Sequence, residues 1–275
     1  MTAKIQSKVY RFAVYAGAFF SMAVLMLILG YILIKGIPHL SPELFAWEYN
    51  SNNVSMMPSI IYTLLMTLIS LIVCVPLGIG AAIYLTEYAR RGSRLVKIVR
   101  MTAETLSGIP SIIYGLFGSL FFVVALKMGL SLISGALTLS IMVLPTIMRT
   151  TEEALLAVPD SYREGSFGLG AGRLRTTFKV VLPSAVPGIL SGVILAVGRI
   201  VGETAALIYT AGTVAKIPDS LLDSTRTLAV HMYTISTEGL YINQSYATAV
   251  VLLVVVLGIN ALSSFIAKRI GRSHT

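Results

Sequence analysis

Residues 58–85 read PSIIYTLLMTLISLIVCVPLGIGAAIYL, an apolar run that contains no charged side chain. A transmembrane helix needs about 20 apolar residues to cross a hydrocarbon core about 30 Å thick, so this run is long enough to span a membrane. Similar runs lie on both sides of it. The predicted spans lie near residues 12–34, 58–85, 106–126, 128–148, 185–211 and 246–267. We therefore predict an all-α membrane protein with six transmembrane helices that form one domain over residues 1–275.

The composition of the whole chain agrees with the bilayer as its main solvent. Of its 275 residues, 56% are hydrophobic and 12% are charged, and the mean hydropathy is +0.84. A soluble domain is about 45–50% apolar and about 25% charged. The first run follows a basic start, as in a signal peptide, but it is too long for a signal-peptide apolar region. We expect it to be retained as a span.

The basic residues are divided unevenly among the segments between the spans. Sixteen of the 21 Lys and Arg residues lie in the two terminal segments, in 86–105 and in 149–184. Because basic residues are enriched in cytoplasmic segments, we predict that both termini are cytoplasmic. This asymmetry explains the net charge of +9, so we expect contacts with anionic membrane lipid and no nucleic-acid partner.

The residues that could carry metal or catalytic chemistry are few. The three histidines, His39, His231 and His274, lie outside the predicted spans, and we expect them to be solvated and to form no metal site. Cys74 is the single cysteine and cannot form an internal disulfide. We find neither a phosphate-binding G-x-x-x-x-G-K-S/T pattern nor a nucleophile with its base. The chain is therefore not expected to be an enzyme.

The segment 149–184 is too long for a tight connection and too patterned to be disordered. Thr150–Glu153 and Ser161–Glu164 each match a capping box, which predicts two helix starts. Gly170 and Gly172 offer left-handed positions at which the second helix can stop. We predict a small helix-turn-helix platform on the cytoplasmic side.

The fifth predicted span carries two charged residues, Arg199 and Glu203. A charge at mid-bilayer costs about 2.5–3.5 kcal/mol even on the lenient insertion scale, so such residues usually face a partner or a cavity. On a continuous helix they share one face with Gly188 and Gly192, whose G-x-x-x-G spacing allows close helix approach. Two interpretations stay open, a structural ion pair between residues four apart and an oxyanion pathway. The predicted pathway residues are Arg199, Glu203, Thr204 and Arg149.

Residues 164–183, EGSFGLGAGRLRTTFKVVLP, resemble the EAA loop of binding-protein-dependent ABC importers. That pattern is E-A-A, three residues, G, nine residues, I, any residue, L-P, and the chain departs from it at Gly165, Ser166 and Val180. The resemblance implies that the loop couples the permease to a cytoplasmic ATPase. The residues implied in this coupling are Glu164, Gly165, Gly170, Leu182 and Pro183.

Residues 198–212, GRIVGETAALIYTAG, resemble the G-R-x-x-G-E-T-A segment of the PstA family of phosphate importer permeases, as do residues 110–118 and 148–172. The related PstC subunits usually carry methionine at the position of Ala205. The resemblance implies a type I ABC importer fold in a bacterial or archaeal inner membrane. It also implies a complex with the sister permease PstC, an ATPase dimer that binds ATP and magnesium, and an extracytoplasmic phosphate-binding protein. This chain itself is expected to hold no cofactor.

Other functions stay in view. Permeases for molybdate or sulfate have similar EAA loops, and the G-E-T segment is the feature that favours phosphate. A stand-alone secondary carrier would need its own coupling-ion site and typically an internal repeat, and we see neither. The PstA segment usually has a proline where this chain has Ala206, so we expect a straighter fifth span.

Overall fold

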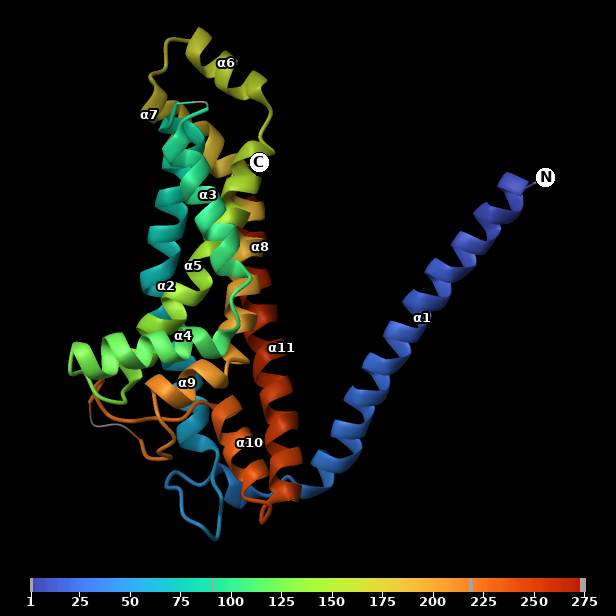
Figure 1. Cartoon of the computed structure of the whole chain (residues 1–275), viewed down its shortest axis with the longest axis vertical. Coiled ribbons are helices and arrows are strands. Elements are labelled where there is room, and N and C mark those ends of the chain that lie inside the picture. Colours follow the sequence, from blue (N-terminus) through green and yellow to red (C-terminus); the bar gives the residue numbers. More distant parts are fainter. Residues whose placement is uncertain (1, 91, 218–219, 273–275) are drawn as a thin grey trace.

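The computed structural model describes residues 2–90, 92–217 and 220–272, and these residues form helices and connecting loops without a strand. Five described helices are long and apolar enough to cross a membrane, and a bent helix pair brings the number to six. The predicted all-α membrane fold is therefore confirmed. Figure 1 shows a tall bundle with α6 and α7 at one end, called the α6 end, and α10 at the other, called the α10 end.

The helices follow one another along the chain as α1 (Thr2–Gly36), α2 (Met57–Ile83), α3 (Arg94–Ser107), α4 (Ser111–Gly118), α5 (Leu132–Leu156), α6 (Asp160–Gly168), α7 (Arg173–Thr176), α8 (Leu182–Val201), α9 (Ala205–Thr210), α10 (Leu228–Thr237) and α11 (Ile242–Arg272). Short 3-10 turns at Ile37–His39 and Pro42–Phe45 follow α1. Wider π turns extend α2 over Tyr84–Tyr88 and α4 over Ser119–Ala125, and a third π turn, Thr177–Val181, precedes α8.

The third span differs from the prediction. Instead of one helix over 106–126, Arg94–Ser107 and Ser111–Ala125 meet at an angle of 103°. Pro110 stands at the corner, where it lacks an amide hydrogen and disfavours the helical conformation of Ile109. As a result α4 runs across the long axis of the bundle (Figure 1).

The fourth and fifth spans also have other boundaries. α5 continues to Leu156, so Thr150 does not begin a helix, and its hydroxyl donates to the Thr146 carbonyl at 2.9 Å. The predicted span 185–211 is interrupted, because α8 ends at Val201 and α9 begins at Ala205. The expectation of a straighter fifth span, and of one continuous helical face for Arg199 and Glu203, is therefore wrong.

The core lies around α5, which packs against α2 and α8. In the most apolar stretch of α5, 67% of the residues are buried, against 0% in α1. Gly188 and Gly192 permit the contact between α8 and α5, as expected, because a methyl group added at Gly188 would lie 2.7 Å from the Ala154 Cβ, and one at Gly192 would overlap Thr150. α1 joins the bundle at Gly36, against the Tyr246 backbone, and its first half stands apart (Figure 1).

One histidine lies in the core at the α10 end. His39 is exposed and His274 lies outside the described residues, but His231 is fully buried, so the expectation of a solvated side chain is wrong for this residue. Burial and the charge of Arg226 lower the pKa of His231 to about 3, although a hydrogen bond with the Val54 backbone opposes the shift. His231 is therefore neutral at physiological pH.

We expect the pKa of His231 to make stability depend on pH. Between its ordinary pKa of about 6.5 and about 3, the unfolded chain binds a proton that the folded chain does not, so stability is lost as the pH falls. The free energy of unfolding should fall by up to roughly 2 kcal/mol between pH 7 and pH 5. Thermal or denaturant unfolding of the purified chain should show this loss in the parent and in His39→Gln, and a smaller one in His231→Gln. Equal pH dependence in all three proteins would contradict it.

We also expect Gly192→Val to weaken the α5–α8 contact, because the added side chain must displace Thr150. Overpacking of this kind typically costs about 1–3 kcal/mol. Gly198→Val is the matched control in the same helix, since a methyl group added there meets nothing within 4 Å. The thermal unfolding midpoint of the purified chain should drop for Gly192→Val well below that of Gly198→Val. Equal midpoints would mean that close approach at Gly192 does not matter.

Candidate functional site

The break between α8 and α9 holds one of the two charged residues of the fifth span. Glu203 is 8% exposed, and its Oε1 accepts a hydrogen bond from the amide of Ala206 at 3.1 Å. Amides in the first turn of a helix have no partner within the helix, and the helix dipole favours negative charge there. The carboxylate of Glu203 therefore stabilises the start of α9.

Arg199 lies in the last turn of α8 and is half-buried. No ion pair joins it to Glu203 in the part of the chain that the structure describes, so the four-residue spacing does not produce the direct contact that we considered. Its charge interacts with the Tyr114 phenol on α4. A guanidinium at a helix C-terminus is also favoured by the helix dipole, and no hydrogen bond from the described residues occupies the Nη and Nε donors of Arg199.

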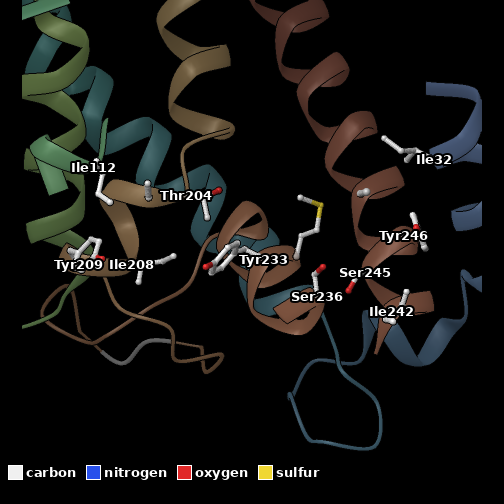
Figure 2. Close-up of a pocket in the computed structure, with 13 residues that line it drawn as sticks. Ile32, Ile112, Thr204, Ile208, Tyr209, Tyr233, Ser236, Ile242, Ser245 and Tyr246 are labelled. Atoms are coloured by element: carbon white, nitrogen blue, oxygen red, sulfur yellow. The ribbon is translucent and has the colours of Figure 1, made fainter. Parts of the chain in front are cut away.

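Thr204 lines a cavity of about 660 Å³ between α9, α10 and α11, shown in Figure 2. Its polar wall consists of hydroxyl groups, which belong to Thr204, Tyr209, Tyr233, Ser236, Ser245 and Tyr246. Ile112 of α4 and Ile32 of α1 complete the apolar part, and no charged side chain is among the lining residues. The volume falls within the usual range for small-molecule sites, and hydroxyls can donate hydrogen bonds to an oxyanion.

The structure does not place Arg149 at this cavity. Arg149 lies two turns before the end of α5, near the α6 end, and its exposed side chain donates from Nε to Glu153 Oε1 at 3.1 Å. Of the four predicted pathway residues, Thr204 lines the cavity. Arg199 and Glu203 precede Thr204 in the chain and are not among the lining residues. The hydroxyls of α10 and α11 were not predicted, because scattered Ser and Tyr residues carry no spacing signal.

The platform that resembles an EAA loop is formed by α6, α7 and the turn between them. Gly170 has φ +81°, as predicted, whereas Gly172 is extended with φ −74°. Glu164 and Gly165 are exposed on α6, and Leu182 and Pro183 are half-buried at the start of α8. The predicted capping box at Ser161–Glu164 does not form, because α6 follows Pro159 without a side-chain cap. Exposed apolar side chains stand on this platform, namely Tyr162, Phe167, Leu169 and Leu174.

All five N–H groups of Arg163 donate hydrogen bonds, and all but the one to Asp160 fasten α6 to the rest of the bundle. Nε and Nη2 bind the Glu87 carboxylate, with Nη2 2.7 Å from Oε1. Nη2 also donates to the Leu155 carbonyl at 2.9 Å, and Nη1 donates to the Val158 carbonyl at 2.8 Å and to Asp160 Oδ1 at 3.2 Å. No sequence pattern predicted this contact, because Glu87 is 76 residues away along the chain.

Comparison with known proteins finds relatives that are membrane components of transport systems. A family model described as "Binding-protein-dependent transport system inner membrane component" matches residues 74–273. The "Probable ABC transporter permease protein YqgI" of Bacillus subtilis is 34% identical over 79% of this chain and 79% of its own length. The "Phosphate transport system permease protein PstA" of Pasteurella multocida is 37% identical over 76% of this chain and 74% of its own length.

A solved structure has the same fold. One chain of a bacterial alginate ABC transporter, crystallised with an alginate-bound periplasmic protein, superposes with a TM-score of 0.68 and 15% identity over 96% of this chain and 97% of that one. The predicted type I importer fold is thus confirmed. The chain belongs to the family of binding-protein-dependent transport system inner membrane components, which are the membrane permeases of ABC transporters.

Proposed function

We propose that this permease translocates inorganic phosphate into the cytoplasm, driven by ATP hydrolysis on a partner ATPase that holds ATP and magnesium. The observation that carries the choice of phosphate is the identity of 33–37% to relatives named phosphate transport system permease PstA, over about three quarters of the chain. The G-R-x-x-G-E-T-A segment forms the break beside the hydroxyl-lined cavity. Molybdate and sulfate are the competing oxyanions.

The complex that we propose contains a PstC-like sister permease, an ATPase dimer and an extracytoplasmic phosphate-binding protein. The α6 end carries the basic segments of the chain, which supports a cytoplasmic position for it and for both termini. The exposed apolar side chains of α6 and the Gly170 turn form a surface suited to the ATPase. Glu164, Gly165, Leu182 and Pro183 are proposed to take part in this contact or in its transmission.

In this proposal Arg199 and Thr204 contact the anion on its way, while Glu203 holds α9 in place and Arg149 has a minor part. A guanidinium without a carboxylate partner can bind a phosphate oxygen, and the hydroxyl of Thr204 can add a second hydrogen bond. The cavity wall carries no fixed charge. Binding there should therefore be weak enough for release, as a transport pathway requires.

The test of the substrate is uptake into proteoliposomes by the complex co-purified with this chain, measured with labelled phosphate, sulfate and molybdate. We expect ATP-dependent uptake of phosphate, reduced at least about tenfold in Arg199→Met, the usual cost of losing one charged hydrogen bond. Glu203→Gln keeps an acceptor for the Ala206 amide and should retain most uptake. Preferred uptake of another oxyanion would refute phosphate, and parent-level uptake by assembled Arg199→Met would remove Arg199 from the pathway.

Coupling is the second part of the proposal. Arg163 holds α6 to Glu87 after α2 and to the carbonyl groups near the end of α5, so a movement of α6 must pull on both helices. The pair is largely buried, with side chains 16% and 8% exposed. Removing one partner would leave an unpaired buried charge, whereas replacing both partners with apolar residues is better tolerated.

We therefore expect the double variant Arg163→Met with Glu87→Leu to insert and assemble. Its complex should hydrolyse several-fold more ATP per phosphate imported, because α6 can then move without α2. The measurement is the ratio of ATP hydrolysed to phosphate taken up by purified complexes. Asp160→Asn is the matched control, since it removes the exposed partner of the same arginine and should leave the ratio unchanged. An unchanged ratio in the double variant would show that Arg163 only stabilises the platform.

A further inference from the structure

Arg226 is a buried cation that has no counter-charge among the described residues. It lies two residues before α10 and is 4% exposed, and in the described part of the chain its Nε and Nη2 have no hydrogen-bond acceptor. No carboxylate of residues 2–90, 92–217 or 220–272 forms an ion pair with it. A guanidinium does not lose its proton in a protein, so the charge persists. Its Cζ lies 4.5 Å from the centroid of the Tyr49 ring, and this cation–π contact offsets only part of the cost of burying the charge.

The two unpartnered nitrogens lie on the same edge of the guanidinium. Nε–H and Nη2–H point in parallel, which is the geometry that binds a carboxylate or phosphate through two hydrogen bonds. Arg163 in the same chain uses this edge to hold Glu87, at 3.2 Å from Nε and 2.7 Å from Nη2 to the same oxygen. Arg226 thus presents the same binding edge with the acceptor missing.

The surroundings of Arg226 favour an anion. His231 is fully buried, and among the described residues the Val54 backbone is the one hydrogen-bond partner near its ring. A neutral imidazole offers one donor and one acceptor. The Thr225 hydroxyl is also buried and has no partner within residues 2–90, 92–217 and 220–272. α10 begins at Leu228, and the dipole of its N-terminal end adds positive potential.

α10 joins Arg226 to the cavity of Figure 2. Tyr233 and Ser236 line the cavity from α10, and Tyr233 lies two turns beyond Arg226. The ring of Tyr49, which is half-buried, lies over the guanidinium. An anion can therefore reach Arg226 when Tyr49 moves aside, and it then lies at the start of the helix that forms one wall of the cavity.

We propose that the Nε/Nη2 edge of Arg226, with Thr225 and His231 beside it, is a second oxyanion site, which takes up an inorganic phosphate-type anion at the α10 end before it enters the cavity. The site rests on the proposed function for the identity of the anion. The same chemistry could be satisfied by a carboxylate of a docking protein, so the experiment must separate the two sources.

The experiment is thermal unfolding of the full-length purified chain in lipid nanodiscs, titrated with phosphate and, at matched ionic strength, with chloride. A ligand of the folded state raises the unfolding midpoint in proportion to the logarithm of its concentration. We expect phosphate to stabilise the parent, and Arg226→Met to weaken the apparent affinity roughly tenfold to a hundredfold, the range for lost hydrogen bonds to a charged group. The apparent phosphate affinity of Arg226→Lys, which keeps the charge but not the paired donors, should lie between those of the parent and Arg226→Met.

Arg226→Met should fold, because replacing an unpaired buried charge with an apolar side chain of similar size removes a desolvation cost. Arg175→Met is the matched control, since Arg175 is exposed on α7 at the α6 end and its titration should match the parent. Equal phosphate titrations of the parent and Arg226→Met would overturn the site. A second result would also overturn it: phosphate does not raise the unfolding midpoint of the parent, and an extracytoplasmic binding protein co-purifies with the parent but not with Arg226→Met. That result would identify a carboxylate of the binding protein as the partner of Arg226.

The outcome is separable from that of the proposed function. If the parent complex imports phosphate but Arg226→Met titrates like the parent, the second site is wrong and the function stands. If sulfate or molybdate is imported and stabilises the parent through Arg226, the site stands and phosphate is the wrong substrate.

Discussion

The absence of water from the hydrocarbon core is the constraint on which this structure depends, because every backbone N–H and C=O there needs a partner from the protein. Regular helices meet this need, and a break in a helix does so only with help from side chains. The break after α3 is repaired by Tyr114, whose hydroxyl donates to the Leu106 carbonyl at 2.8 Å. The break after α8 is repaired by Glu203, which accepts from Ala206. Tyr114 belongs to the short helix that follows its break, and Glu203 lies just before the short helix that follows the other.

The two short helices lie against each other across the bundle. A methyl group added at Gly115 of α4 would lie 2.7 Å from the Ala206 Cα of α9, so only glycine permits this contact. Ile112 and Thr204, from the same two helices, then line the cavity of Figure 2. Irregular backbone at membrane depth is tolerated where it borders a cavity. The broken helices and the cavity are therefore one feature, and neither charge of the fifth span needs to pair with the other.

Hydropathy predicted the positions of the spans that are single long helices, such as α1, α2 and α11. It could not place the bend at Pro110 or the break at Gly202, because an apolar run looks the same whether it is one helix or two. The capping-box pattern at Thr150 predicted a helix start, but this residue lies inside α5. The burial of α5 outweighs the local preference for a cap. Contacts such as Arg163 with Glu87, and the burial of His231, depend on segments far apart in sequence. They appear only when the chain is folded.

α5 connects the two ends of the molecule mechanically. At its last turn the Leu155 carbonyl accepts from Arg163 and so holds α6. At its first turn the Ser131 amide donates to the Thr210 carbonyl of α9 at 3.0 Å, and the Leu132 amide donates to the Asp223 carbonyl at 3.1 Å, in the segment that leads to Arg226. Because close-packed interiors move as units rather than deform, a displacement of α6 should reach both the cavity and Arg226 through this one helix. The proposed coupling surface and the proposed anion sites are then connected through α5, which is the most buried of the five long apolar helices because it packs against both α2 and α8.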